Sequence, residues 1–188
     1  MDDLRIAKDD PTWNRGESAN VYSLPVAISV DSLSVEKLTV GIPKNQIKKV
    51  GMLLTAQSPD SHIGPYKWAI DFLVPDDTLV LAAKEGQIVE AIDDFNTWGI
   101  TADFRDKLNY ITIQHDKGEY SRYCHLAQYS FRNTKLKVGD KISKGEVIAR
   151  VGKTGWTDRD HLHFIVFKIE QSSKNPFGFY SLKIRFEK

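Results

Sequence analysis

The chain has 188 residues, 41% of them hydrophobic and 27% charged, which is enough to bury a core in one domain with a modest extension. Its 26 basic and 25 acidic residues leave a net charge of +1, which does not favour nucleic acid or an anionic membrane as a partner. No apolar stretch is long enough to span a bilayer, and the acidic N-terminus has no apolar run typical of a signal peptide.

Short strands separated by turns are predicted along most of the chain. Residues 1–57 are predicted to be a β-rich N-terminal extension, a polar arm followed by strand-like runs from residue 20. A loop at 58–65 opens the second part, residues 58–188. Single strands are predicted at 79–83, 87–91, 109–115, 120–126, 161–169 and 182–186, and two strands within 135–151. Because long helical periodicity is absent, the predicted fold is all-β, a compact sandwich or barrel.

Two segments, 79–89 and 138–148, resemble each other and predict duplicated hairpins. Each places a glycine after a charged residue, followed by a polar residue and two β-branched residues. Biotinyl and lipoyl carrier domains use similar hairpins, so a carrier or phosphotransfer module is one alternative. A carrier would need a modified lysine such as Lys84 or Lys144, but neither has the neighbours that such domains show. A phosphocarrier would need an isolated nucleophilic histidine, and the pairing of His161 with His163 argues against that.

Two of the five histidines form the motif His161-Leu162-His163 at the start of a predicted strand. Since residues i and i+2 of a strand share a face, both imidazoles point the same way while Leu162 points into the core. Two imidazoles on one face suit a metal ligand beside a group that handles protons. A pair of surface histidines is the alternative.

Asp71 lies inside an apolar run, where a carboxylate is costly to bury without a positive partner. That partner is either a basic side chain, with Lys67 close in sequence, or a divalent metal. His62 lies in the loop before Asp71, where a histidine by itself predicts only a solvated surface residue.

The remaining histidines and the single cysteine are less informative by themselves. His125 ends a predicted strand and would be an ordinary buried histidine, and we expect His115 to be structural. Cys124 precludes an internal disulfide, and strand alternation turns it away from His125, which argues against a catalytic cysteine.

Seven motifs in a fixed order resemble the lysostaphin/LytM-type zinc endopeptidases, which cut peptide bridges of bacterial cell walls. They are Ala69-Ile70-Asp71-Phe72, the segment 80–88, Asn109-Tyr110-Ile111, Tyr123-Cys124-His125-Leu126, the segment 138–145, Gly152-Lys153-Thr154-Gly155 and His161-Leu162-His163-Phe164. Each motif is weak by itself, but together they cover roughly residues 60 to 170. The resemblance implies an antiparallel β core, a hybrid of sandwich and barrel, with an open groove and zinc at its floor. The groove walls would be residues 92–107, 126–136 and the segment around Trp156.

The resemblance also implies the site. One Zn²⁺ would be held by His62, Asp71 and His163, with a fourth position left for water. His125 and His161 would be the two catalytic histidines, one taking a proton from the water and the other stabilising the oxyanion. Asn109 and Trp156 are candidates for contact with substrate.

Two departures from the family pattern bear on these assignments. Many members place the first ligand four residues before the aspartate, where this chain has Lys67; His62 fits relatives with a Ser-His-x-Gly motif further upstream. Arg159-Asp160 replaces the Gly-Pro that often precedes the histidine pair.

The implied partner is a peptidoglycan peptide, acted on by a monomer. A catalytically inactive relative that binds cell wall or regulates another hydrolase is the alternative. Localisation is left open between the periplasm or cell wall, if a leader was removed, and the cytoplasm.

Overall fold

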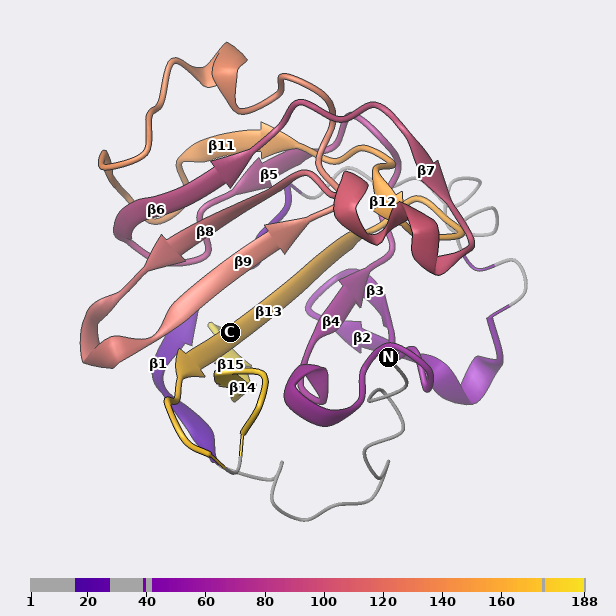
Figure 1. Cartoon of the computed structure of the whole chain (residues 1–188), viewed down its shortest axis with the longest axis horizontal. Helices are drawn as coiled ribbons and strands as arrows, with labels where there is room; N and C mark the ends of the chain where they lie inside the picture. Colours follow the sequence, from indigo (N-terminus) through magenta and orange to yellow (C-terminus); the bar gives the residue numbers. More distant parts are fainter. Residues whose placement is uncertain (1–15, 28–38, 40–41, 174, 188) are drawn as a thin grey trace.

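The computed structural model describes residues 16–27, 39, 42–173 and 175–187, and these residues form an almost purely β structure (Figure 1). The largest sheet contains, in spatial order, β10 (Lys141–Ile142), β6 (Gly86–Ile92), β8 (Tyr110–Gln114), β9 (Tyr120–Cys124), β13 (Leu162–Ile169), β4 (Ile70–Phe72), β3 (Leu53–Ala56) and β2 (Ile47–Val50), with β14 (Phe179–Ser181) also paired to β13. Every pair in this sheet is antiparallel. The prediction of an all-β, antiparallel core is confirmed.

Three two-stranded sheets and a few short 3-10 turns complete the described fold. The sheets pair β5 (Leu79–Leu81) with β11 (Val147–Arg150), β7 (Trp98–Gly99) with β12 (Gly155–Trp156), and β1 (Glu17–Tyr22) with β15 (Lys183–Phe186); the last two are parallel. The turns are η3 (Lys44–Gln46), η4 (Gly64–Tyr66), η5 (Ala102–Lys107), η6 (Asp116–Gly118) and η7 (Arg132–Thr134). Within the described ranges, no helix has the length and hydrophobicity needed to cross a bilayer.

The two similar hairpins pair with each other crosswise. β5 precedes the turn of the first hairpin and pairs with β11, which follows the turn of the second; β6 pairs with β10 in the same way. Gly145 at the second turn also donates its backbone N–H to the carbonyl of Ala82 in the first, at 2.8 Å. The sequence duplication therefore corresponds to a structural unit in which each hairpin supplies the other's missing strands.

The long strand β13 separates the main core from a second, smaller cluster on the opposite face of the sheet. Leu162 and Phe164 belong to the main core, whereas Ile165 and Phe167 pack with partners on the other face. This alternation is the period of two that a strand imposes. His163, between Leu162 and Phe164, therefore lies on the face opposite the main core.

The N-terminal strand β1 packs into the same core as the rest of the molecule. Tyr22 is fully buried, and its ring contacts His115 and Phe164 edge-on. In Figure 1, β1 and β15 lie behind β9 and β13. Strands on both sides of residue 57 thus contribute to one structure, since β2 and β3 belong to the main sheet, and a functional division at that residue stays a prediction.

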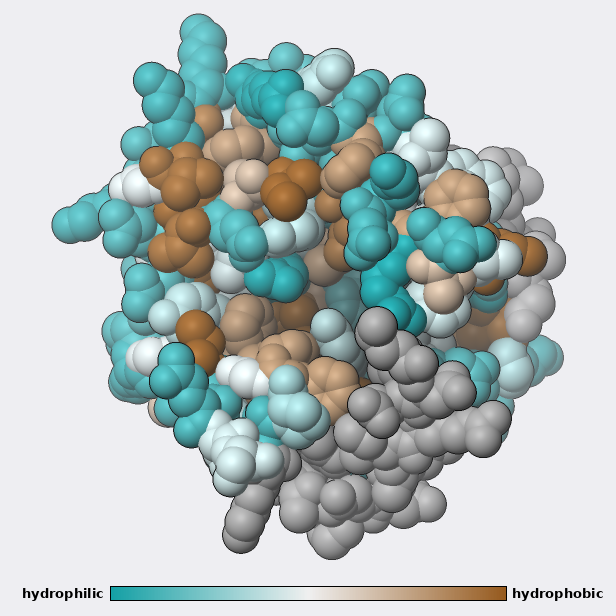
Figure 2. All heavy atoms as spheres, in the orientation of Figure 1, coloured by the Kyte–Doolittle hydropathy of each residue, from teal (hydrophilic) through white to brown (hydrophobic). Residues whose placement is uncertain are grey.

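Figure 2 shows the face seen in Figure 1, where hydrophilic and hydrophobic side chains are intermixed and the surface is hollowed near the middle. Among the large apolar residues that remain exposed, Trp98, Ile100 and Trp156 are close in the structure because β7 and β12 pair and the Trp156 indole bonds Ile100. This region joins residues 92–107 to the segment around Trp156, two of the three predicted groove walls.

Candidate metal centre

Asp71 and His163 lie directly opposite each other on neighbouring strands. β4 and β13 pair in a register that places Asp71 across from His163, and cross-strand partners on one face have adjacent side chains. His163 Nδ1 is 2.8 Å from Asp71 Oδ1. The sheet register alone therefore brings together two residues that are ninety-two positions apart in sequence.

His62 reaches the same carboxylate from the loop that precedes β4. The base of this loop is closed by the Gln57 side-chain amide, which donates to the carbonyl of Ala69 at 2.8 Å. Gly64 has a φ of 55°, a left-handed conformation that glycine adopts without strain. His62 is 8% exposed, and its Nε2 lies 3.1 Å from Asp71 Oδ1. The prediction from chain pattern alone that His62 is a solvated surface residue is wrong, because loop closure buries it.

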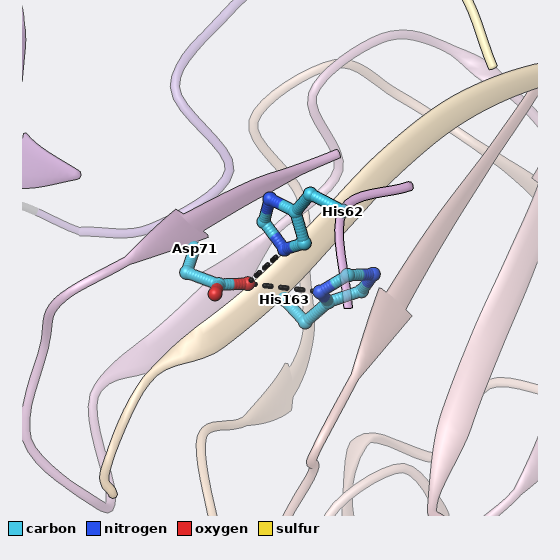
Figure 3. A group of neighbouring side chains, drawn as sticks. All are labelled: His62, Asp71 and His163. Atoms are coloured by element: carbon cyan, nitrogen blue, oxygen red, sulfur yellow. Dashed lines mark hydrogen bonds and ion pairs between the residues drawn. The ribbon is translucent and has the colours of Figure 1, made fainter. Parts of the chain in front are cut away.

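The three side chains converge on one point. Figure 3 shows the imidazoles of His62 and His163 directed toward the carboxylate of Asp71. The ligand atoms of the three residues all lie within 4.8 Å of one another. Lys67, which stands four residues before Asp71, places its ammonium 5.8 Å from the centre of the Trp68 ring.

His161 is the third histidine close to the Asp71 carboxylate. Its Nε2 is 3.6 Å from Asp71 Oδ1, and its Nδ1 lies 3.0 Å from the carbonyl oxygen of Arg159. Because a carbonyl can only accept, Nδ1 carries the proton, and Nε2 is the nitrogen that faces the cluster. His161 and His163 thus share a face, as their spacing predicted.

His125 joins the cluster through an unusual backbone conformation. Strand alternation would turn it away from the face of Cys124 and His163, which lie opposite each other in neighbouring strands. Instead, β9 ends at Cys124 and His125 has a φ of 62°, a left-handed conformation that costs a non-glycine residue about 1 kcal/mol. The His125 ring centre lies 4.7 Å from that of His161 and 6.1 Å from that of His163.

Two polar residues brace the loops around His125. Asn109 is fully buried; its amide donates to the carbonyls of Phe95 and Leu126, and its carbonyl accepts from the Phe95 N–H. The Thr154 hydroxyl donates to the Leu126 carbonyl, and the Thr154 carbonyl accepts from His125 Nδ1 at 2.7 Å. Asn109, a predicted candidate for substrate contact, is therefore placed beneath the site as a brace. Thr154 appeared in the sequence only as part of a motif, and its role depends on contacts that spacing does not reveal.

Gly152 is a further residue whose role the sequence did not show. Its N–H donates to the His125 carbonyl at 2.8 Å. A Cβ at this position would lie 2.4 Å from Ala127 Cα, closer than packing allows. Only glycine lets the two backbones approach closely enough to hold His125 in its left-handed conformation.

The charges of the site are strongly coupled. Burial by itself would raise the pKa of Asp71, but His62 and His161, together with hydrogen bonds from His163 and His62, hold it well below its usual range. Burial lowers the pKa of His163, and the Asp71 carboxylate opposes that shift. Burial and the neighbouring imidazoles lower the pKa of His125 to about 3, so its ring is neutral. The cluster therefore contains an ionised Asp71 carboxylate together with the neutral imidazole of His125.

The donor set fits a zinc ion. Two imidazole nitrogens and one carboxylate oxygen are a known ligand set for catalytic zinc, and donors on a tetrahedron with bonds of 2.0–2.1 Å are roughly 3.3 Å apart. Here His62 Nε2 and His163 Nδ1 lie 3.1 Å and 2.8 Å from Asp71 Oδ1. His62 Nδ1 is buried and has no hydrogen-bond partner among the described residues, so the polar interaction of this ring is directed entirely at the cluster.

Cys124 and Trp156 flank the cluster in different ways. Cys124 is buried, and burial raises the pKa of its thiol to about 12, which makes it a poor nucleophile. Trp156 is 45% exposed, its indole N–H donates to the Ile100 carbonyl, and the guanidinium of Arg105 lies 5.2 Å from its ring centre. Trp156 follows Thr154, the residue that holds His125, by two positions, and its contact with substrate stays a prediction.

Residues 65–176, more than half of the chain, match the model of Peptidase family M23. The chain belongs to peptidase family M23. The matched segment of this M23 member begins after His62, so one of the three clustered side chains lies outside it. The structure, rather than the match, joins His62 to Asp71 and His163.

Among similar M23-type sequences, an uncharacterized metalloprotease of Buchnera aphidicola is 34% identical over 98 residues, 52% of this chain and 22% of that protein. Lysostaphin of Staphylococcus simulans is 31% identical over 102 residues, 54% of this chain and 18% of lysostaphin. The peptidoglycan DD-endopeptidase ShyA of Vibrio cholerae is 31% identical over 94 residues, 50% of this chain and 18% of ShyA. The chain thus spans about a fifth of the length of each of these relatives.

Proposed function

We propose that this M23 family member is a zinc-dependent endopeptidase that hydrolyses peptide bonds in peptidoglycan stem peptides or cross-bridges. The observation that carries the proposal is the convergence of His62, Asp71 and His163 on one point, with His125 and His161 beside them. The substrate class is supported by the similarity to lysostaphin and to a peptidoglycan DD-endopeptidase.

His62, Asp71 and His163 would hold the metal, which when bound supplies Lewis acidity to acidify a water and polarise a carbonyl. His125 is neutral and donates a hydrogen bond from Nδ1 to the Thr154 carbonyl, so its Nε2 carries the free lone pair. That nitrogen accepts a proton from the attacking water. His161, likewise fixed through Nδ1, would in its doubly protonated form donate a hydrogen bond from Nε2 to the developing oxyanion. Fixing both rings through backbone carbonyls positions them before the substrate arrives.

The test is cleavage of purified sacculi and of defined cross-linked peptides by the zinc-loaded chain. We expect chelator-sensitive hydrolysis, bound zinc at one equivalent, and loss of both in His163→Ala. His161→Ala should retain the metal but lose about 100-fold or more in kcat/KM, because it removes one positioned proton donor. A metal-loaded, folded chain that leaves every one of these substrates intact would contradict the proposal.

Neither alternative fits the structure as well. An inactive relative needs no intact constellation, but here all five side chains are present and oriented. A carrier module needs an accessible lysine at a hairpin tip. The ammonium of Lys84 instead pairs with Glu85, and that of Lys144 pairs with Glu187 at 2.6 Å.

A further inference from the structure

Arg122 lies on the same face of the main sheet as the metal-ligand cluster. It is two residues before Cys124, which is opposite His163, and Arg122 itself lies opposite Ile165. Two residues along a strand correspond to about 7 Å, so Arg122 is within one or two substrate residues of the cluster. None of the steps proposed above uses this side chain.

The guanidinium of Arg122 is held in place but is not fully used. Nε donates to the Thr112 hydroxyl at 2.8 Å, and Nη2 donates to Glu90 at 2.7 Å. The group lies over the rings of Tyr110 and Phe167, at 4.5 Å and 5.6 Å from their centres. Nη1 makes no hydrogen bond within the described part of the chain, and a third of the side chain is exposed. A fixed, partly open guanidinium is suited to bind a planar anion.

Tyr66 supplies a second unused donor on the same face, because it packs in the cluster that contains Phe167, the ring over which the Arg122 guanidinium lies. Its ring packs against Phe179 at 5.2 Å and lies 6.5 Å from the His163 ring, so it borders the cluster. Burial raises the pKa of Tyr66 and Cys124 adds to the rise, while the nearby charges of Arg122 and Arg105 oppose it. The hydroxyl therefore stays protonated, and it forms no hydrogen bond with any residue that the structure describes.

We propose that Arg122 and Tyr66 form a carboxylate-binding subsite beside the metal-ligand cluster, so that the preferred substrates are peptides with a free carboxylate next to the scissile bond. This proposal rests on the proposed endopeptidase function and narrows its substrate class away from neutral peptides such as oligoglycine. The planar fork of arginine matches a carboxylate. Glu90, which already takes one edge of the guanidinium, repels anions of higher charge.

The test uses two peptides that differ in one group, a free carboxylate on the residue next to the scissile bond or its amide. For the zinc-loaded chain we expect kcat/KM to favour the carboxylate peptide by about 10- to 100-fold, mostly through KM, as for a charge-assisted hydrogen bond. Arg122→Gln should reduce this preference to near unity, and Tyr66→Phe should reduce it by about threefold to tenfold. The exposed Arg185→Gln on β15 is the matched control and should leave the preference unchanged.

Glu90→Gln separates a binding role from a structural one. If the ion pair with Glu90 only stabilises the sheet, this variant can only weaken the protein. If Arg122 binds substrate, removal of the competing carboxylate should raise the preference for the carboxylate peptide several-fold. Equal kcat/KM for the two peptides with the wild-type chain, or a preference that survives in Arg122→Gln, would overturn the proposal.

Equilibrium binding distinguishes failure of the subsite from failure of the proposed function. Both peptides are titrated against the His161→Ala protein, which retains Arg122 and Tyr66. Tighter binding of the carboxylate peptide supports the subsite even if the wild-type chain cleaves neither peptide, in which case only the endopeptidase proposal fails. Equal affinities overturn the subsite whatever the hydrolysis results.

Discussion

Two buried carboxylates, Asp71 and Glu119, have opposite surroundings. Asp71 is 9% exposed and is approached by the nitrogens of three histidines. Glu119 is fully buried just before β9 and accepts four hydrogen bonds from β1. They come from the hydroxyls of Ser18 and Tyr22, the N–H of Ala19 and the side-chain amide of Asn20, at 2.6–3.0 Å.

The two carboxylates differ in whether the groups around them can also bind a cation. The donors around Glu119 are neutral hydroxyl and amide groups, which satisfy a carboxylate but include no imidazole or second carboxylate to bind a cation. The imidazoles around Asp71 can present lone pairs once they lose a proton. In the part of the chain that the structure describes, the ligand-type group that forms is the one at Asp71. Burial of a carboxylate therefore does not identify a metal site; the identity of its donors does.

The most severe way to break the comparison is Asp71→Asn. The amide keeps the shape of the side chain but removes its charge, so we expect zinc to be lost and kcat/KM to fall about 1,000-fold or more. Zinc content by mass spectrometry and peptide hydrolysis measure the effect. Glu119→Gln is the matched control and should retain its zinc; zinc loss in that variant would mean that the two carboxylates are not independent.

Removal of zinc by a chelator should lower the free energy of unfolding only when Asp71 is intact, whatever residue stands at position 119. A ligand present at 1,000 times its Kd stabilises the folded state by about 4 kcal/mol, so removal of zinc should lower the free energy of unfolding by an amount of that order. Thermal unfolding with and without chelator measures the change. The increment should persist in Glu119→Gln and vanish in Asp71→Asn, and an increment that survives in Asp71→Asn would place the metal elsewhere.

Glu119→Ala should destabilise the fold without affecting metal stoichiometry. It leaves the donors from β1 without their acceptor, at a cost of about 2–4 kcal/mol in the free energy of unfolding. Urea unfolding of the zinc-loaded protein measures the loss. The exposed Glu85→Ala, on the neighbouring turn, is the control and should change stability by less than about 0.5 kcal/mol.

The smallest effect is expected in the acid dependence of stability. Although burial by itself would raise the pKa of Glu119, the hydrogen bonds from Ser18, Ala19, Tyr22 and Asn20 lower it below the usual 4.5. A depressed pKa contributes stability above the unfolded-state value, and this stability is lost as the pH falls through the folded-state value. The stability difference between wild type and Glu119→Gln should therefore narrow as the pH falls below about 4.5. A difference that widens on acidification would contradict this account.

The strands and half of the cluster could be predicted from the sequence. Strand periodicity places His161 and His163 on one face, and the apolar run around Asp71 requires a positive partner. Both inferences depend on neighbours close in sequence, where the geometry of a strand is fixed. The register of β4 against β13, which joins the two features, is visible only in the folded sheet.

Other parts of the site depend on contacts that the sequence does not encode locally. His62 is delivered by a loop whose base is closed between Gln57 and Ala69. His125 faces the cluster because of one left-handed residue, against the alternation of its strand. The attachment of β1 to Glu119 spans about a hundred residues, and no local pattern predicts such a long-range contact.

The crosswise pairing of the two hairpins is expected to slow folding. The paired strands β5 and β11 come from segments roughly sixty to seventy residues apart, so their pairing must first overcome the entropy cost of closing a long loop. Chains dominated by such distant pairings fold slowly and expose unpaired strand edges in the meantime. Refolding from denaturant should accordingly be slow and give the best yield at high dilution, where those edges rarely meet another molecule.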